Sequence, residues 1–137
     1  MKIGMYAYTV GPDGMLRVVE KAARAKGHDV IRLEPNKQGV VSARKHELSD
    51  CDVLVMGLSS VHVEEELELA EYLEGKPRFV VEDVPESACR PGAEIFAPKV
   101  ELCLVAREDA IHSARKFGFA PDRVRYIGPP PHWGESY

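Results

Sequence analysis

The sequence has 137 residues, enough for one domain with its own core but too few for two domains of ordinary size. Its formal net charge of -4 at pH 7 supplies no basic surface, so we expect no binding to nucleic acid. No apolar run is long enough to span a membrane, and residues 1–10 lack the apolar block of a signal peptide. We therefore expect a cytoplasmic protein without a membrane span.

The three cysteines indicate no metal centre. Cys51, Cys89 and Cys103 are far apart and form no C-x-x-C pair, which a zinc site or a redox motif would show. Cys103 lies in an apolar run and is expected in the core. We predict neither a metal nor a cofactor.

The first 33 residues have the pattern of a strand, a helix and a second strand. Lys2–Thr9 is apolar and predicts a strand, and Gly11–Gly14 interrupts it as a loop. From Met15, apolar residues recur at helical spacing until Gly27, which is typical of a helix end. Asp29–Leu33 predicts the second strand. A unit of this kind gives two parallel strands joined by a right-handed crossover.

The remaining chain repeats this alternation. We predict a short strand at 40–43, a turn or short helix at 44–48, a central strand at 52–58, a helix at 63–73, strands at 78–81 and 100–106, a helix from 108 or 109 to 117, a turn at 121–123 and a last strand at 124–127. The fold class is therefore α/β, an open and mostly parallel Rossmann-like sheet with helices on both faces. Residues 1–128 form the single domain, and residues 129–137 form a proline-rich tail.

Ligands of open parallel sheets bind at the carboxyl ends of the strands. There the sequence places polar residues that we predict to contact a ligand: Ser59, Ser60, Glu82 and Arg107. Polar loops occur at both ends of any such sheet, so each position also has a purely structural interpretation.

The glycine segment after the first predicted strand has two interpretations. Gly11 and Gly14 allow a ligand to approach the backbone closely, and the helix behind them directs N–H groups toward a phosphate or a sugar hydroxyl. The segment is neither G-x-G-x-x-G nor a Walker A loop. The alternative is a tight turn into the helix with Asp13 as its cap.

The ends of two predicted strands are followed by residues that can act as a general base. His62 follows the central strand, and the unperturbed pKa of histidine lies near neutrality. Asp83 and its neighbour Glu82 follow the next strand, where one of the two side chains can face a cleft.

Two segments of the sequence resemble the N-terminal half of GT-B glycosyltransferases. The first is the glycine segment 11–14 with its helix, followed by Gly-His-Asp-Val at 27–30, which leads into the second strand. The second is the strand, helix, Pro-Asp-Arg turn and glycine-ended strand over 100–130.

The resemblance implies a domain that binds a small-molecule acceptor, while a second domain or chain binds the nucleotide sugar. The sequence stops where that second domain would start, so the resemblance implies a half that is inactive alone. The positions that fit the base of such enzymes are Asp13, His62 and Asp83.

The alternative is a stand-alone Rossmann-like or flavodoxin-like domain that binds a small molecule. A receiver domain is not indicated, because the first and central strands end without the required aspartates. Hydrolase chemistry is not indicated either, since Ser59 and Ser60 are not in a G-x-S-x-G elbow.

Overall fold

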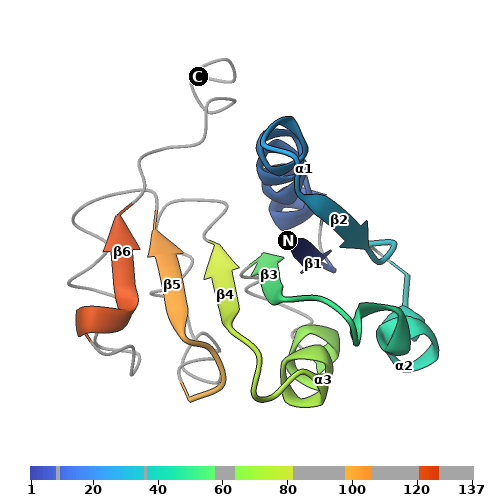
Figure 1. The fold of residues 1–137 in the computed structure, drawn as a ribbon. Helices are drawn as coiled ribbons and strands as arrows, with labels where there is room; N and C mark the ends of the chain where they lie inside the picture. The colour runs from blue at the N-terminus through green and yellow to red at the C-terminus, as the bar shows by residue number, and fades with distance from the viewer. Residues whose placement is uncertain (9, 36, 58–63, 82–97, 106–120, 127–137) are drawn as a thin grey trace.

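The computed structural model describes residues 1–8, 10–35, 37–57, 64–81, 98–105 and 121–126. These residues contain a six-stranded sheet in the order β2-β1-β3-β4-β5-β6, in which every neighbouring pair is parallel (Figure 1). The strands are β1 (Lys2–Tyr6), β2 (Asp29–Arg32), β3 (Val53–Gly57), β4 (Arg78–Val81), β5 (Leu102–Val105) and β6 (Val124–Tyr126). The predicted open parallel α/β sheet is confirmed, and each strand lies within its predicted segment.

Helices cover both faces of the sheet, as predicted. Helix α1 (Val10–Ala25) lies on one face, and α2 (Val40–Arg44) and α3 (Glu64–Tyr72) lie on the other (Figure 1). The α1 face buries Met5, Leu16 and Val55 among others. The opposite face buries Leu54 and Leu69 in a larger apolar cluster. Because neighbouring side chains of β3 point to opposite faces, its apolar run serves both clusters.

Close packing fixes the residue type at one position of β1. A Cβ atom at Gly4 would lie 3.2 Å from the Sγ atom of Cys51. Cys51 is itself buried just before β3. A side chain at position 4 would therefore require the Cys51 thiol to shift, whereas glycine lets this loop pack directly on the sheet.

The first helix begins earlier than the sequence predicted. The segment Gly11–Gly14, expected to be a loop, forms the first turns of α1, which starts at Val10. Pro12 is compatible with this position, because N–H groups of a first helical turn have no partner within the helix. The predicted strand Lys2–Thr9 is correspondingly short and ends at Tyr6.

The predicted strand at 40–43 is wrong, because these residues form helix α2. Val40 and Val41 are β-branched and favour a strand by propensity. Both are nevertheless buried in the core beside α3, whereas a strand would direct consecutive side chains to opposite faces. Tertiary packing therefore overrides local propensity here. The following 3-10 helix Lys45–Leu48 agrees with the predicted turn or short helix.

Two predicted segments have other outcomes. The turn at 121–123 is a 3-10 helix, Pro121–Arg123, which leads into β6. The helix expected from 108 or 109 to 117 lies outside the described residues. Among the described helices, none has the length and apolar character that crossing a membrane requires.

Candidate functional site

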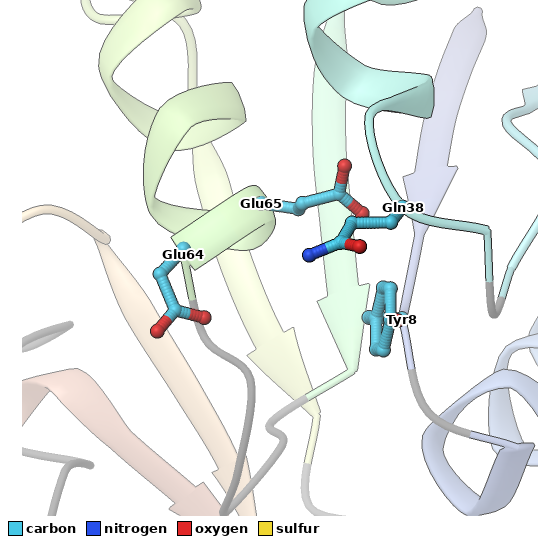
Figure 2. Close-up of a pocket in the computed structure, with 4 residues that line it drawn as sticks. All are labelled: Tyr8, Gln38, Glu64 and Glu65. Carbon is cyan, nitrogen blue, oxygen red and sulfur yellow. The ribbon is translucent and has the colours of Figure 1, made fainter.

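A pocket lies between the carboxyl ends of β1 and β3, where the connections between strands switch from one face of the sheet to the other. The chain leaves β1 toward α1 on one face and resumes after β3 in α3 on the other face. In open α/β sheets, ligands bind at such a point. The pocket has a volume of ≈ 320 Å³ and is lined by Tyr8, Gln38, Glu64 and Glu65 (Figure 2). We call it the acidic pocket.

Glu65 joins three parts of the chain at this pocket. Its Oε2 atom accepts a hydrogen bond of 2.7 Å from the Tyr6 hydroxyl of β1. Its Oε1 atom accepts one of 2.7 Å from the backbone N–H of Gly39, directly before α2. Figure 2 shows the Glu65 carboxylate beside the Gln38 side chain, close to the Tyr8 ring. Through its contact with Gly39, Glu65 holds the adjacent residue Gln38 at the pocket.

The next residue of α3 holds the end of β1. Glu66 is fully buried, and its Oε1 atom accepts a hydrogen bond of 2.8 Å from the backbone N–H of Tyr8. Tyr6 is also fully buried. Its burial, the hydrogen bond to Glu65 and the nearby charges of Glu65 and Glu66 raise the pKa of its phenol well above the ordinary value. Tyr6 therefore stays protonated and acts as a donor.

The carboxylates of the acidic pocket lack a cationic partner within the described part of the chain. Glu64 and Glu65 form no ion pair there, and the nearby cation Lys45 pairs with Glu68 at 3.2 Å. The described lining of this pocket is therefore negative. Carboxylates, an amide and a phenol are groups that hydrogen-bond neutral hydroxyls, and the negative charge disfavours phosphate.

A second pocket lies at the carboxyl end of β2, and we call it the basic pocket. Its volume is ≈ 280 Å³, and it is more open to solvent than an interior cavity. It is lined by Asp13, Arg17, Arg32, Leu33, Glu34, Pro35 and Arg44. Three guanidinium groups thus face two carboxylates.

Arg32 connects β2 to α1 at the basic pocket. It donates from Nη2 to Asp13 and from Nη1 to Glu20, the latter at 3.0 Å. Arg17 donates to the other oxygen of Asp13 at 3.2 Å. Burial acts to raise the pKa of Glu20, but the hydrogen bonds from Arg24 and Arg32 outweigh it, and the pKa is lowered. Both acidic residues of α1 are thus held as partners of arginines.

The described residues include three of the nine predicted site residues. Asp13 is buried and lines the basic pocket, while Gly11 and Gly14 lie in the first turns of α1. A Cβ atom at Gly14 would meet no atom within 4 Å, so close packing does not require this glycine. The other six, which lie outside the described residues, are Ser59, Ser60, His62, Glu82, Asp83 and Arg107.

Sequence reasoning missed most of the residues that line the two pockets. The glutamates of α3 lie in its first turn, where carboxylates also complement the helix dipole, so their place in the sequence does not by itself indicate a pocket. One available signal was the spacing of Tyr6 and Tyr8, which places two polar-tipped aromatics on one face of the predicted strand Lys2–Thr9. Their proximity to Glu65 requires the tertiary fold, since 59 residues separate Tyr6 from Glu65.

Metal and thiol chemistry find no support in the described residues. Within them, no group of three His, Cys, Asp or Glu side chains is arranged to hold a metal ion. Cys51 is buried, and this burial raises the pKa of its thiol despite the nearby Lys76. A thiol in this setting is a poor nucleophile.

Comparison with known proteins identifies a similar fold. No family model matches the chain, and no curated protein matches its sequence. Among solved structures, the lipopolysaccharide outer core galactosyltransferase WaaB in its apo form is similar, with a TM-score of 0.59 at 10% sequence identity. The match covers 90% of this chain and 44% of that enzyme. The chain therefore has the fold of one half of a GT-B glycosyltransferase, as the sequence resemblance predicted.

Proposed function

We propose that this chain is the acceptor-binding half of a GT-B type glycosyltransferase and that the acceptor occupies the acidic pocket. The observation that carries the proposal is the position of this pocket, between the carboxyl ends of β1 and β3. The fold supports the proposal, because the match covers 90% of this chain but only 44% of the galactosyltransferase chain. The nucleotide sugar would then be bound by a separate domain or chain.

The chemistry of the acidic pocket favours an acceptor over a donor. Gln38 and Glu64 are exposed at its edge and can hydrogen-bond sugar or polyol hydroxyls. The uncompensated charge of Glu64 and Glu65 opposes the pyrophosphate of a nucleotide sugar. A neutral, hydroxyl-rich ligand is the class that this lining accommodates best.

The transfer itself requires a base beside the acceptor hydroxyl. The hydroxyl oxygen attacks the anomeric carbon, the base takes its proton, and the nucleoside diphosphate leaves with the electron pair of the broken bond. We propose His62, two positions before Glu64 in the sequence, or Asp83 for this role. Asp13 is the third candidate, although its contacts with Arg17 and Arg32 favour a positioning role. Ser59, Ser60, Glu82, Arg107, Gly11 and Gly14 are the proposed ligand contacts.

A flavodoxin-like binding module is the second candidate. The order β2-β1-β3-β4-β5 is also that of flavodoxin-like sheets, which bind a flavin at the β1/β3 point. The acidic lining there opposes a flavin phosphate, so we rank this function second.

Calorimetry and two-dimensional NMR on the intact chain separate the two functions. The probes are glucose, galactose, myo-inositol, UDP-glucose and FMN. We expect a neutral probe to bind with a Kd on the order of 1 mM, near -4 kcal/mol, and to shift the signals of Tyr8 and Gln38. The shifts of Tyr8 and Gln38 should show no tighter binding for UDP-glucose and FMN than for glucose.

Matched variants locate the binding. Glu64→Gln and Gln38→Ala should weaken the neutral probe severalfold, whereas Glu74→Gln should not. Glu74 is an exposed glutamate directly after α3 that carries the same charge outside the pocket. Tight binding of FMN, with shifts of Tyr8 and Gln38 that glucose does not produce, would replace the proposal by the flavodoxin-like function. Equal effects of E64Q and E74Q would remove the acidic pocket as the site.

A further inference from the structure

The basic pocket has the features of a ligand site that the proposed acceptor site does not use. It lies at the carboxyl end of β2, on the same edge of the sheet as the acidic pocket. We propose that it binds an oxyanion, meaning the phosphate monoester or carboxylate group of a small molecule. The proposal rests on residues other than those of the acidic pocket and does not depend on the proposed function.

Two arginines at this pocket have donors available for a ligand. Arg17 uses only its Nε atom, toward Asp13, and its side chain is 72% exposed. Within the described residues, its two terminal nitrogens form no hydrogen bond. Arg44 uses Nε and Nη2 toward Glu47, at 2.7 and 3.0 Å, and its Nη1 atom forms none there. Guanidinium groups bind phosphate and carboxylate through such N–H pairs.

A third arginine of this pocket is held in a fixed position by two ion pairs. Arg32 is mostly buried, with a side chain 17% exposed, and contacts Asp13 and Glu20. Because β2 and α1 hold these partners, the Arg32 guanidinium is positioned before any ligand arrives. Asp13 orients Arg32 and Arg17 together, which gives this buried carboxylate a positioning role.

The charge of the lining contrasts with that of the whole chain. Three arginines and the carboxylates of Asp13 and Glu34 line the pocket, although the chain has a net charge of -4. Glu47 and Glu20, which pair with Arg44 and Arg32, lie outside this lining. The side chains of Arg17 and Arg44 are the exposed members of their pairs, and ion pairs at the surface contribute little to stability. A ligand oxyanion can therefore share these guanidinium groups without a large loss of folding free energy.

NMR titration of the intact chain in a low-salt buffer tests this site, with inorganic phosphate as the first probe. Phosphate should shift the side-chain Nε–Hε signals of Arg17, Arg32 and Arg44 in a saturable manner. Glucose 6-phosphate should bind about tenfold tighter than glucose if the ligand group is a phosphate. Glucuronate should bind about tenfold tighter than glucose if the ligand group is a carboxylate. Either result supports the site.

Matched variants test whether the pocket itself is responsible. Arg17→Gln and Arg44→Gln should each weaken binding of the anionic probe about tenfold. Arg123→Gln removes the same charge from an exposed position before β6, at the opposite edge of the sheet, and should change affinity less than about twofold.

Two results overturn the site. One is the absence of phosphate shifts at all three arginines. The other is an equal loss of affinity in R123Q and R17Q, which would show a general charge effect. If the intact chain binds phosphate but does not bind glucose, only the proposed acceptor site is overturned.

Discussion

The acidic and basic pockets are lined by nearby residues of the chain between β2 and α2, but their charged groups differ. Gln38 lines the acidic pocket, and Leu33, Glu34 and Pro35 line the basic pocket. Both use carboxylates from the first turns of a helix to hold a strand. At the acidic pocket, Glu65 accepts from neutral donors, the Tyr6 hydroxyl and the Gly39 N–H. At the basic pocket, Asp13 accepts from two guanidinium groups.

The choice of donor decides what charge remains for a ligand. A phenol or a backbone amide satisfies a carboxylate without neutralising it, so the acidic pocket keeps its negative charge. An arginine neutralises its partner but has five N–H donors, so Arg17 and Arg44 keep N–H groups for a ligand after pairing with Asp13 and Glu47. The net charge of a chain thus says little about the ligands that its individual pockets can bind.

The largest expected effect comes from removing the central cation of the basic pocket. Arg32→Met leaves the buried Asp13 carboxylate without its strand partner and should lower the free energy of unfolding by about 3 kcal/mol. Arg17→Met is the control, because Arg17 is exposed and its removal leaves Asp13 paired with Arg32, so it should cost only about 0.5 kcal/mol. Urea denaturation measures both. Similar losses in the two variants would show that the Asp13–Arg32 pair is no more important than a surface pair.

The neutral contacts of the acidic pocket should matter somewhat less. Glu65→Ala leaves the buried Tyr6 hydroxyl unsatisfied and should cost about 2 kcal/mol. In a double-mutant cycle with Tyr6→Phe, the coupling energy should be about 1 kcal/mol. Glu64→Ala, at the exposed neighbour, should change the free energy of unfolding by less than about 0.5 kcal/mol. Additive effects of E65A and Y6F would contradict the hydrogen bond.

Two glycines, one beside each pocket, should respond in opposite directions to alanine. Gly14→Ala fills open space within α1 and should stabilise the protein by up to about 1 kcal/mol. Gly39→Ala should destabilise by about 1 kcal/mol, because Gly39 has a φ of 84° and positions the N–H that Glu65 accepts. Thermal unfolding distinguishes them. Destabilisation by G14A would favour the loop interpretation of residues 11–14.

The smallest effect should depend on pH. The Glu20 pKa is lowered below the ordinary value of 4.5, so its ion pairs contribute fully above about pH 4.5. That contribution is lost as the pH falls through the lowered pKa. Glu20→Gln should therefore cost about 0.5 kcal/mol at pH 7, a value limited by solvent screening. The difference from the wild-type protein should shrink in urea titrations as the pH is lowered below 4.5, and a constant difference would contradict the ion-pair role.

The strands could be predicted from sequence because each is a continuous apolar run. β4 even has the predicted bounds, Arg78–Val81. Helix α2 could not, since Val40 and Val41 favour a strand until α3 is packed against them. Asp13 was identified from its position, but its partner Arg32 lies on another element. Contacts between elements therefore determined both the acidic pocket and the role of Asp13, and local sequence does not encode them.

The strand order also affects how the protein can be assembled during synthesis. β1 is made first, β2 and β3 pair on its two sides, and β4, β5 and β6 then follow one after another at the β3 side. No described strand has to enter between two strands that are already paired. A chain emerging from the ribosome can therefore extend this sheet in the order of translation, and the strands around both pockets are in place once β3 has been made.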